Sequence, residues 1–436
     1  MSDGERPAGI SRRRLLAGGA AAGGLVATGT LAAGLPADAQ VANDSAAGRS
    51  GQATAGRTGA GHTGAGQAAA GQVTAEPIGT GAATGQPAAP QGVDGTAVEP
   101  FHGARQAGVA TTPQAHAAFA GLDLRKGVGR EALGRLMRLL TDDARRLTQG
   151  RGALADTEPE LAALPARLTV TFGFGPGLFR AAGVKGGPEQ LPRFSVDRLE
   201  DRWSGGDLLL QICCDDPVTL AHALRMIVKD TASFTKVRWV QRGFRQAVQR
   251  PGLTQRNLMG QLDGTVNPTP GTPEFERAVW ITDGPLAGGT MLVLRRIRML
   301  MDSWDAADRV AKEFTVGRRL DNGAPLSGRA EHDEADFAKV NAIGFPVISE
   351  YAHIRRAHTQ DPGLRMFRRV YNYDDGDTGL LFAAYQADVA RQFTPVQRRL
   401  AKADLLNEWT TPIGSAVFYV PPGCEESGWV GQGLLG

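Results

Sequence analysis

The sequence has little cysteine, no aromatic residue in its first hundred positions, and no long run of strongly apolar residues. Only three cysteines occur in 436 residues: Cys213, Cys214 and Cys424. Neighbouring side chains of a strand face opposite ways, so we interpret the adjacent pair as two small hydrophobic residues, and a disulfide framework is not indicated. The formal net charge of +3 is close to balance, so nothing in the composition points to nucleic-acid binding.

Residues 40–100 contain no Phe, Trp or Tyr and consist largely of Ala, Gly, Thr, Gln and Pro. Such a segment cannot bury enough apolar surface to offset the entropy lost on ordering. We therefore predict a disordered tether over residues 40–100. Because every aromatic residue lies at or after Phe101, we expect the folded part to begin there.

The N-terminus carries the run Ser11-Arg12-Arg13-Arg14-Leu15-Leu16, followed by an Ala/Gly-rich stretch and the small residues Ala37-Asp38-Ala39. This order is typical of a twin-arginine export signal, which we place at residues 1–39. It predicts export to the periplasm, the cell envelope or the exterior. A membrane-spanning helix needs about 20 strongly apolar residues, and glycine and threonine dilute this run. An uncleaved signal that tethers the protein to the membrane stays open.

The folded part repeats one order of elements. The first half reads strand, helix, strand, strand, helix, strand, and the second half does the same. Each half is typical of a ferredoxin-like β-α-β-β-α-β unit. We predict an α+β fold of two tandem units, residues 101–262 and 263–436, with facing sheets and a ligand cleft at their junction. The expected elements are 114–124, 133–147, 168–175, 207–214, 217–229 and 236–244, then 290–300, 303–314, 366–373, 379–386, 389–402 and 415–423.

The segment GQLDGTVNP, residues 260–268, places a single carboxylate, Asp263, in a glycine-flanked turn between the two units. Turn chemistry alone can explain an Asp-Gly pair. A calcium loop is a poor alternative, because Gly264, Val266 and Pro268 supply no side-chain oxygen. The position between two domains favours a functional carboxylate instead.

Two histidines lie close together in EYAHIRRAH, His353 and His358. Histidine is the usual partner of a catalytic carboxylate and the usual proximal ligand of haem in peroxidases. No third ligand with zinc spacing follows, which argues against a zinc site. A cofactor role for one of the two histidines stays open from the residues alone.

These segments together resemble the dye-decolourising peroxidases, in particular an exported subgroup that includes the iron-transport-associated deferrochelatase/peroxidase. The resemblance covers the chain from Phe101 to its C-terminus. It rests on the GxxDG motif of Gly260–Gly264 and on FHGARQAGVATTPQ, SGGDLLLQICCDD, RNLMGQLDGTVNP, VGRRLDNGAPLSG, AHIRRAH, RRVYNYDDG, LLFAAYQAD and GSAVFYVPPG.

The resemblance implies a peroxidase with one haem b per chain, held mainly by the second unit. It implies His353 as the proximal iron ligand, Asp263 as the distal acid-base residue, and Arg368 as the distal arginine. For the other ring nitrogen of His353 we expect an acceptor, and we choose Asp388. A charge at a helix N-terminus explains Asp388 equally well.

Further residues are expected around the haem. Gly264 and Thr265 line its edge, and Arg318 pairs with a propionate. Leu381 and Phe382 restrict the distal side, unless they are ordinary strand core. The sequence departs from the family pattern at His358-Thr359-Gln360, where this subgroup has Asn-Pro-Arg. We expect Arg355 or Arg356 to substitute for the missing arginine. His358 stays open as an alternative axial ligand.

The predicted function is oxidation of dyes, phenolics or metal-linked reductants by hydrogen peroxide, with electron transfer from surface Trp or Tyr residues. Two alternatives stay open: haem-iron handling in an uptake system with a permease and a cupredoxin-like protein, and haem binding without turnover. Oligomer formation is undecided.

Overall fold

The computed structural model describes residues 95–247 and 254–436, and the predicted export signal and most of the predicted tether lie outside these residues. The last residues assigned to the tether are an exception. The carbonyl groups of Gly95 and Ala97 accept hydrogen bonds from the amides of Ala166 and Arg167, and Glu99 forms an ion pair with Arg167. The tether prediction is therefore wrong for residues 95–100, because their backbone and charge are paired with the folded part.

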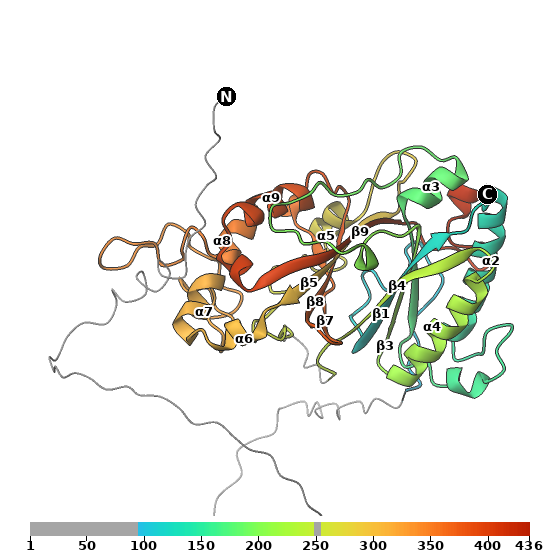
Figure 1. Cartoon of the computed structure of the whole chain (residues 1–436), viewed down its shortest axis with the longest axis horizontal. Helices are drawn as coiled ribbons and strands as arrows, with labels where there is room; N and C mark the ends of the chain where they lie inside the picture. The colour runs from blue at the N-terminus through green and yellow to red at the C-terminus, as the bar shows by residue number, and fades with distance from the viewer. Residues whose placement is uncertain (1–94, 248–253) are drawn as a thin grey trace, which may run out of the picture. The chain divides into compact units, whose positions relative to one another are not determined.

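The first ferredoxin-like unit has the predicted order of elements (Figure 1). Leu133, Leu136, Met137 and Leu140 lie on the buried face of its first helix, as their spacing predicts. The second helix begins after Asp216, whose carboxylate accepts a hydrogen bond from the amide of Thr219. The elements are β1 (His116–Leu124), α2 (Arg130–Thr148), β2 (Thr169–Phe174), α3 (Pro176–Ala182), β3 (Leu208–Cys214), α4 (Pro217–Thr231) and β4 (Thr235–Phe244).

The second unit repeats this order, but one helix and one strand are each divided in two. The strand predicted at 366–373 is the two strands Phe367–Arg368 and Tyr371–Asp374. The single helix predicted near 303–314 is two helices, because Asp308 lies between them in extended conformation and caps the second. The last long helix begins at Phe393, four residues later than predicted. The elements are α5 (Pro273–Val279), β5 (Thr290–Met299), α6 (Met301–Asp305), α7 (Arg309–Val316), α8 (His353–Ala357), β6 (Phe367–Arg368), β7 (Tyr371–Asp374), β8 (Thr378–Gln386), α9 (Phe393–Ala403), β9 (Thr410–Val420) and α10 (Gln432–Leu435).

The two sheets are joined into one. The strand order is β5-β9-β2-β3-β1-β4-β7-β8-β6, and β5 also pairs with β8. The junctions are short: Phe244 pairs with Asn372 between β4 and β7, and Phe174 pairs with Tyr419 between β2 and β9. The strands therefore close into a barrel, which refines the prediction of facing sheets.

Three apolar clusters fill this arrangement. One lies between the first sheet and the helices α2 and α4, which Figure 1 shows along the outer side of β1 and β3. The second fills the barrel interior between the facing sheets. The third packs α9 against the outer face of the second sheet through Val293, Phe393 and Val417. Cys213 belongs to the barrel interior and Cys214 to the helix side, and all three cysteines are free thiols.

Among the residues that the structure describes, no helix is both long enough and apolar enough to cross a membrane.

A pair of carboxyl groups lies between α2 and α4. The Oδ2 atoms of Asp143 and Asp230 are both buried without a hydrogen-bond donor in the described part of the chain. Burial and the adjacent Asp143 carboxyl raise the pKa of Asp230 to about 7. One proton shared between the two carboxyl groups satisfies both oxygens.

This pair predicts a pH-dependent stability. Because the folded state holds a proton that the unfolded chain releases above pH 4, the free energy of unfolding should fall as pH rises through about 7. Asp230→Asn should stabilise the protein by about 1–2 kcal/mol at pH 8 and much less at pH 5, a range discounted for the partial exposure of Asp230. Urea unfolding at both pH values measures this.

Asp142→Asn is the matched control, since Asp142 is the neighbour of Asp143 on α2 and pairs with Arg145 instead. Equal pH slopes for wild type and Asp230→Asn would contradict the shared proton.

Candidate active site

The segment that contains Asp263 is bound to the strand region after β6. The side-chain amide of Gln255 donates to the carbonyl of Val370, and the backbone amide of Leu258 donates to Oδ1 of Asn372. Asn372 is the residue that joins β7 to β4. The barrel junction therefore fixes this segment beside the second sheet.

The turn itself does not need Asp263. Oδ1 of Asn257 accepts hydrogen bonds from the amides of Met259 and Gln261, and Gly260 takes the positive φ of 82°. The amide of Asp263 donates to the carbonyl of Gln255. Since Asn257 supplies the turn chemistry, the carboxylate of Asp263 is left for another use.

That carboxylate binds Arg368. Nη1 of Arg368 lies 3.1 Å from Oδ1 of Asp263, and the two side chains are 22% and 12% exposed. Asn267, at the end of the same turn, also bonds Arg368. The structure therefore brings together the two predicted distal residues, which are 105 positions apart in sequence.

His353 begins α8 and is held by a carboxylate that the sequence analysis missed. Its Nδ1 lies 2.6 Å from Oδ2 of Asp404, which follows α9 and is 3% exposed. Oδ1 of Asp404 accepts from the amide of Leu406. No other hydrogen bond of the His353 ring occurs in the described residues, so Nε2 is unpaired.

The choice of Asp388 as the partner of His353 is wrong. Its Oδ1 accepts hydrogen bonds from the amides of Ala390 and Arg391, and its own amide donates to Gln392. Asp388 thus fixes the turn that precedes α9. This role is close to the alternative interpretation, in which Asp388 is a charged residue at a helix N-terminus.

The electrostatic surroundings of His353 include both distal residues. Burial lowers its pKa, but the charge and hydrogen bond of the Asp404 carboxylate outweigh this, and the pKa lies above its ordinary value. Arg368 acts to lower it and Asp263 to raise it. Asp263 and Arg368 therefore lie near enough to His353 for their charges to act on its ring.

Arg318 and Thr265 meet at Glu331. The Thr265 hydroxyl donates to Oε1 of Glu331 over 2.8 Å, and Nη1 of Arg318 donates to the carbonyls of Gly323 and Glu331. Nη2 of Arg318 forms no hydrogen bond within the part of the chain that is described. Gly264 takes a positive φ of 133°, which favours glycine at this position.

The two predicted distal apolar residues point in opposite directions. Leu381 is buried in the barrel interior, so its predicted place at the distal side is wrong and it is strand core. Phe382, the next residue, faces the α9 side and packs near Phe393. Arg368 pairs with Ala384, and Ala384 shares the sheet face of Phe382 because side chains alternate along a strand.

His222 and His358 have other partners. His222 is bonded to Asp156 over 2.8 Å, with both side chains almost fully buried, and is structural. The His358 ring packs edge-on against Phe337, and burial and Arg365 lower its pKa. Nη1 of Arg355 donates to two backbone carbonyls, while the Nε of Arg356 is buried and has no hydrogen-bond partner among the described residues.

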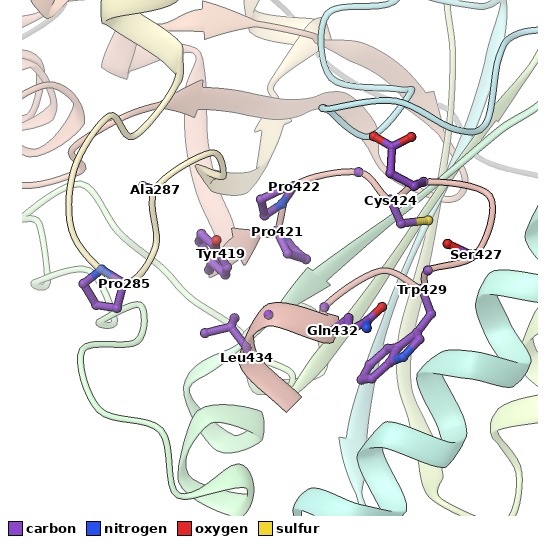
Figure 2. A pocket seen from close by; sticks show the side chains of 15 residues that line it. Pro285, Ala287, Tyr419, Pro421, Pro422, Cys424, Ser427, Trp429, Gln432 and Leu434 are labelled. Atoms are coloured by element: carbon purple, nitrogen blue, oxygen red, sulfur yellow. The ribbon is translucent and has the colours of Figure 1, made fainter. Parts of the chain in front are cut away.

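A separate pocket of about 370 Å³ lies at the C-terminal segment (Figure 2). Pro421, Pro422 and Tyr419 form one side, and Cys424 and Trp429 lie on another. It contains none of the predicted site residues, and burial raises the pKa of the Cys424 thiol. No group of three or more metal-ligating side chains occurs within residues 95–247 and 254–436.

Comparison with known proteins identifies the family of this chain. The profiles of the Dyp-type peroxidase family match the chain in both halves: the N-terminal part at residues 106–245 and the C-terminal part at residues 254–425. The chain therefore belongs to the Dyp-type peroxidase family. It is an enzyme of this type, and the family's members are haem peroxidases.

Relatives include a dye-decolorizing peroxidase of Thermobifida fusca, 42% identical over 70% of this chain and 76% of that protein. A deferrochelatase of Yersinia pestis is 35% identical over 77% of this chain and 85% of its own length. The relatives thus include both kinds of protein that the sequence resembles, a dye-decolorizing peroxidase and a deferrochelatase.

Solved structures give the same result. A DyP-type peroxidase from Cellulomonas bogoriensis is 50% identical, with a TM-score of 0.75 over 78% of this chain and 99% of that chain. Ferric DtpA from Streptomyces lividans is 40% identical, with a TM-score of 0.76 over 80% and 100%. The predicted α+β fold of two ferredoxin-like domains is confirmed, whereas the exact domain boundary at 262/263 stays a prediction.

The Asp404 contact predicts a titration result. In protein without cofactor, His353 should titrate above the ordinary value of 6.5. In Asp404→Asn the carboxylate charge is lost while burial remains, so the pKa should fall below that value. NMR titration of the ring carbons of labelled histidine measures this.

Asp388→Asn is the control and should leave His353 unchanged. The opposite pattern, with a shift in Asp388→Asn only, would restore Asp388 as the partner.

Proposed function

We propose that this protein is a hydrogen-peroxide-dependent haem b peroxidase in which His353 binds the iron and Asp263 and Arg368 act on the peroxide. The observation that carries the proposal is the joint placement of two pairs: Asp263 with Arg368, and His353 with Asp404. The first pair places a carboxylate, which can carry a proton, beside a permanent positive charge. In the second pair, a carboxylate holds the imidazole in one orientation.

The donor set fits haem. The bond between Asp404 and Nδ1 of His353 fixes the ring tautomer and leaves the Nε2 lone pair for iron. A carboxylate partner also makes the imidazole a stronger electron donor, as a peroxidase ligand requires. Arg318, whose Nη2 has no hydrogen bond to the described residues, can pair with a propionate, and Gly264 and Thr265 would lie at the haem edge.

Haem, when bound, would supply the two electrons that cleave the O–O bond of peroxide and would hold the two oxidising equivalents until a reductant is oxidised. The task of the chain is to move one proton from the inner to the outer oxygen of peroxide, so that the outer oxygen leaves as water. Asp263 is suited to this transfer because a carboxylate can accept a proton and return it. Arg368 stabilises the negative charge that develops on the leaving oxygen.

The wall around this site limits which reductant can enter. Phe382 lies on the same sheet face as Arg368 and packs against Phe393. A bulky dye or phenol would be kept from the distal side by such apolar packing. We propose that these substrates are oxidised at the protein surface.

A second candidate is haem-iron handling, favoured by the likeness to a deferrochelatase. In that role the protein would release iron and leave the porphyrin intact, with a permease and a cupredoxin-like protein as partners. Detection of metal-free porphyrin after incubation with haem separates this role from peroxide turnover. A haem carrier without turnover would give neither product.

We also propose export through the twin-arginine route, from the run Ser11–Leu16. Replacing Arg12 and Arg13 by lysine should abolish export and leave full-length protein in the cytoplasm. Cell fractionation with an antibody measures this. The matched control is Arg6→Lys, outside the motif; equal export of all three forms would contradict the route.

Stopped-flow absorbance tests the catalytic roles. With one equivalent of peroxide, the haem-loaded wild type should change its Soret band rapidly. Asp263→Asn should slow this step by about 100-fold or more and Arg368→Leu by about 10- to 100-fold, while both retain haem. His353→Ala should lose haem or its axial ligation.

Asp388→Asn is the control and should react like the wild type. A wild-type Soret band that does not respond to peroxide would favour the carrier or the iron-handling role.

A further inference from the structure

The side chain of Asn267 pairs with the open edge of β6. Its Nδ2 donates to the carbonyl of Arg368 over 2.7 Å, and the amide of Arg368 donates to its Oδ1 over 3.2 Å. The neighbouring residue, Arg369, directs its amide to β8 instead. The primary amide of Asn267 thus takes the place of a neighbouring strand for one residue.

The same oxygen also holds the side chain. Nε of Arg368 lies 3.3 Å from Oδ1 of Asn267, and Nη1 lies 3.1 Å from Asp263. The guanidinium is therefore bonded at two of its nitrogens, to two residues of one turn. Bonds to separate atoms of a planar group fix its direction as well as its position.

Asn267 is itself fixed to the turn of Asp263. Its backbone amide donates to the carbonyl of Gly264 over 2.8 Å. The following residue is Pro268, whose ring restricts Asn267 to extended backbone conformations. The spacing Asp-x-x-x-Asn-Pro thus sets where the amide meets the strand.

We propose that Asn267 is a positioning residue that sets the distance and direction between Arg368 and Asp263. This inference rests on the proposed function of those two residues. Asparagine is suited to the position because one side chain must both donate and accept at short reach. Alanine does neither, and aspartate cannot donate.

The first test needs no haem. In Asn267→Ala the amide of Arg368 loses its acceptor, so its hydrogen exchange in cofactor-free protein should speed up at least tenfold, as measured by mass spectrometry with residue-level fragmentation. Thr272→Ala is the matched control. It removes the side-chain cap of α5, which begins shortly after Asn267, and touches neither distal residue.

The second test uses the haem-loaded protein. Asn267→Ala should lower the rate constant for peroxide about 10- to 100-fold and weaken fluoride binding to the ferric form about tenfold, because a bound fluoride accepts a hydrogen bond from the distal guanidinium. The melting temperature and the resting Soret band should match the wild type. Thr272→Ala should leave fluoride affinity within twofold.

Asn267→Asp serves if the alanine variant does not fold. It keeps the shape and the acceptor, but its charge competes with Asp263 for Arg368, so the peroxide rate should still fall. Unchanged Arg368 exchange together with an unchanged peroxide rate in either variant would overturn the proposal. If Arg368→Leu and Asp263→Asn react at the wild-type rate, the proposed function fails, and the exchange result still decides whether Asn267 fixes Arg368.

Discussion

The pairing of β4 with β7 is the constraint on which the site depends. It joins the two ferredoxin-like sheets through Phe244 and Asn372, and it carries the chain from the first domain directly onto the edge of the second. Gln255, Leu258 and Asn267 then bond successive parts of the region from Arg368 to Asn372.

The two carboxylates of the site have different partners and hence different uses. Asp404 is almost fully buried, and its two carboxylate oxygens form hydrogen bonds with the ring of His353 and with the amide of Leu406. Asp263 is partly exposed and bonded by a guanidinium. A guanidinium keeps its protons, whereas a carboxylate exchanges them. In the proposed function, Asp263 therefore carries the mobile proton and Asp404 orients the imidazole.

The fold could largely be predicted from the sequence, because the patterns that mark its helices and strands are local. Helical spacing in Leu133–Leu147 and continuous apolar strands identify each unit without knowledge of its neighbours. Closure of the barrel was not predictable, since each junction rests on a single residue pair. The break between α6 and α7 was missed because Asp308 reads equally well as a polar helix residue.

The candidate site was predicted in part because some of its residues, like the helices and strands, are marked by local sequence patterns. Asp263, Arg368 and His353 lie in short motifs, and the structure brings them together. The partner of His353 was misassigned because Asp388 and Asp404 both flank α9, and only the tertiary fold shows which end faces α8. Leu381 was misassigned because two adjacent strand residues cannot face the same side.

The central claim is that His353, oriented by Asp404, is the iron ligand of this site. Resonance Raman spectroscopy of the ferrous haem-loaded protein measures the iron–histidine stretch directly. The account predicts a band in the wild type that moves to lower frequency in Asp404→Asn, disappears in His353→Ala and persists in His358→Ala. A band that survives His353→Ala and is lost in His358→Ala would contradict it.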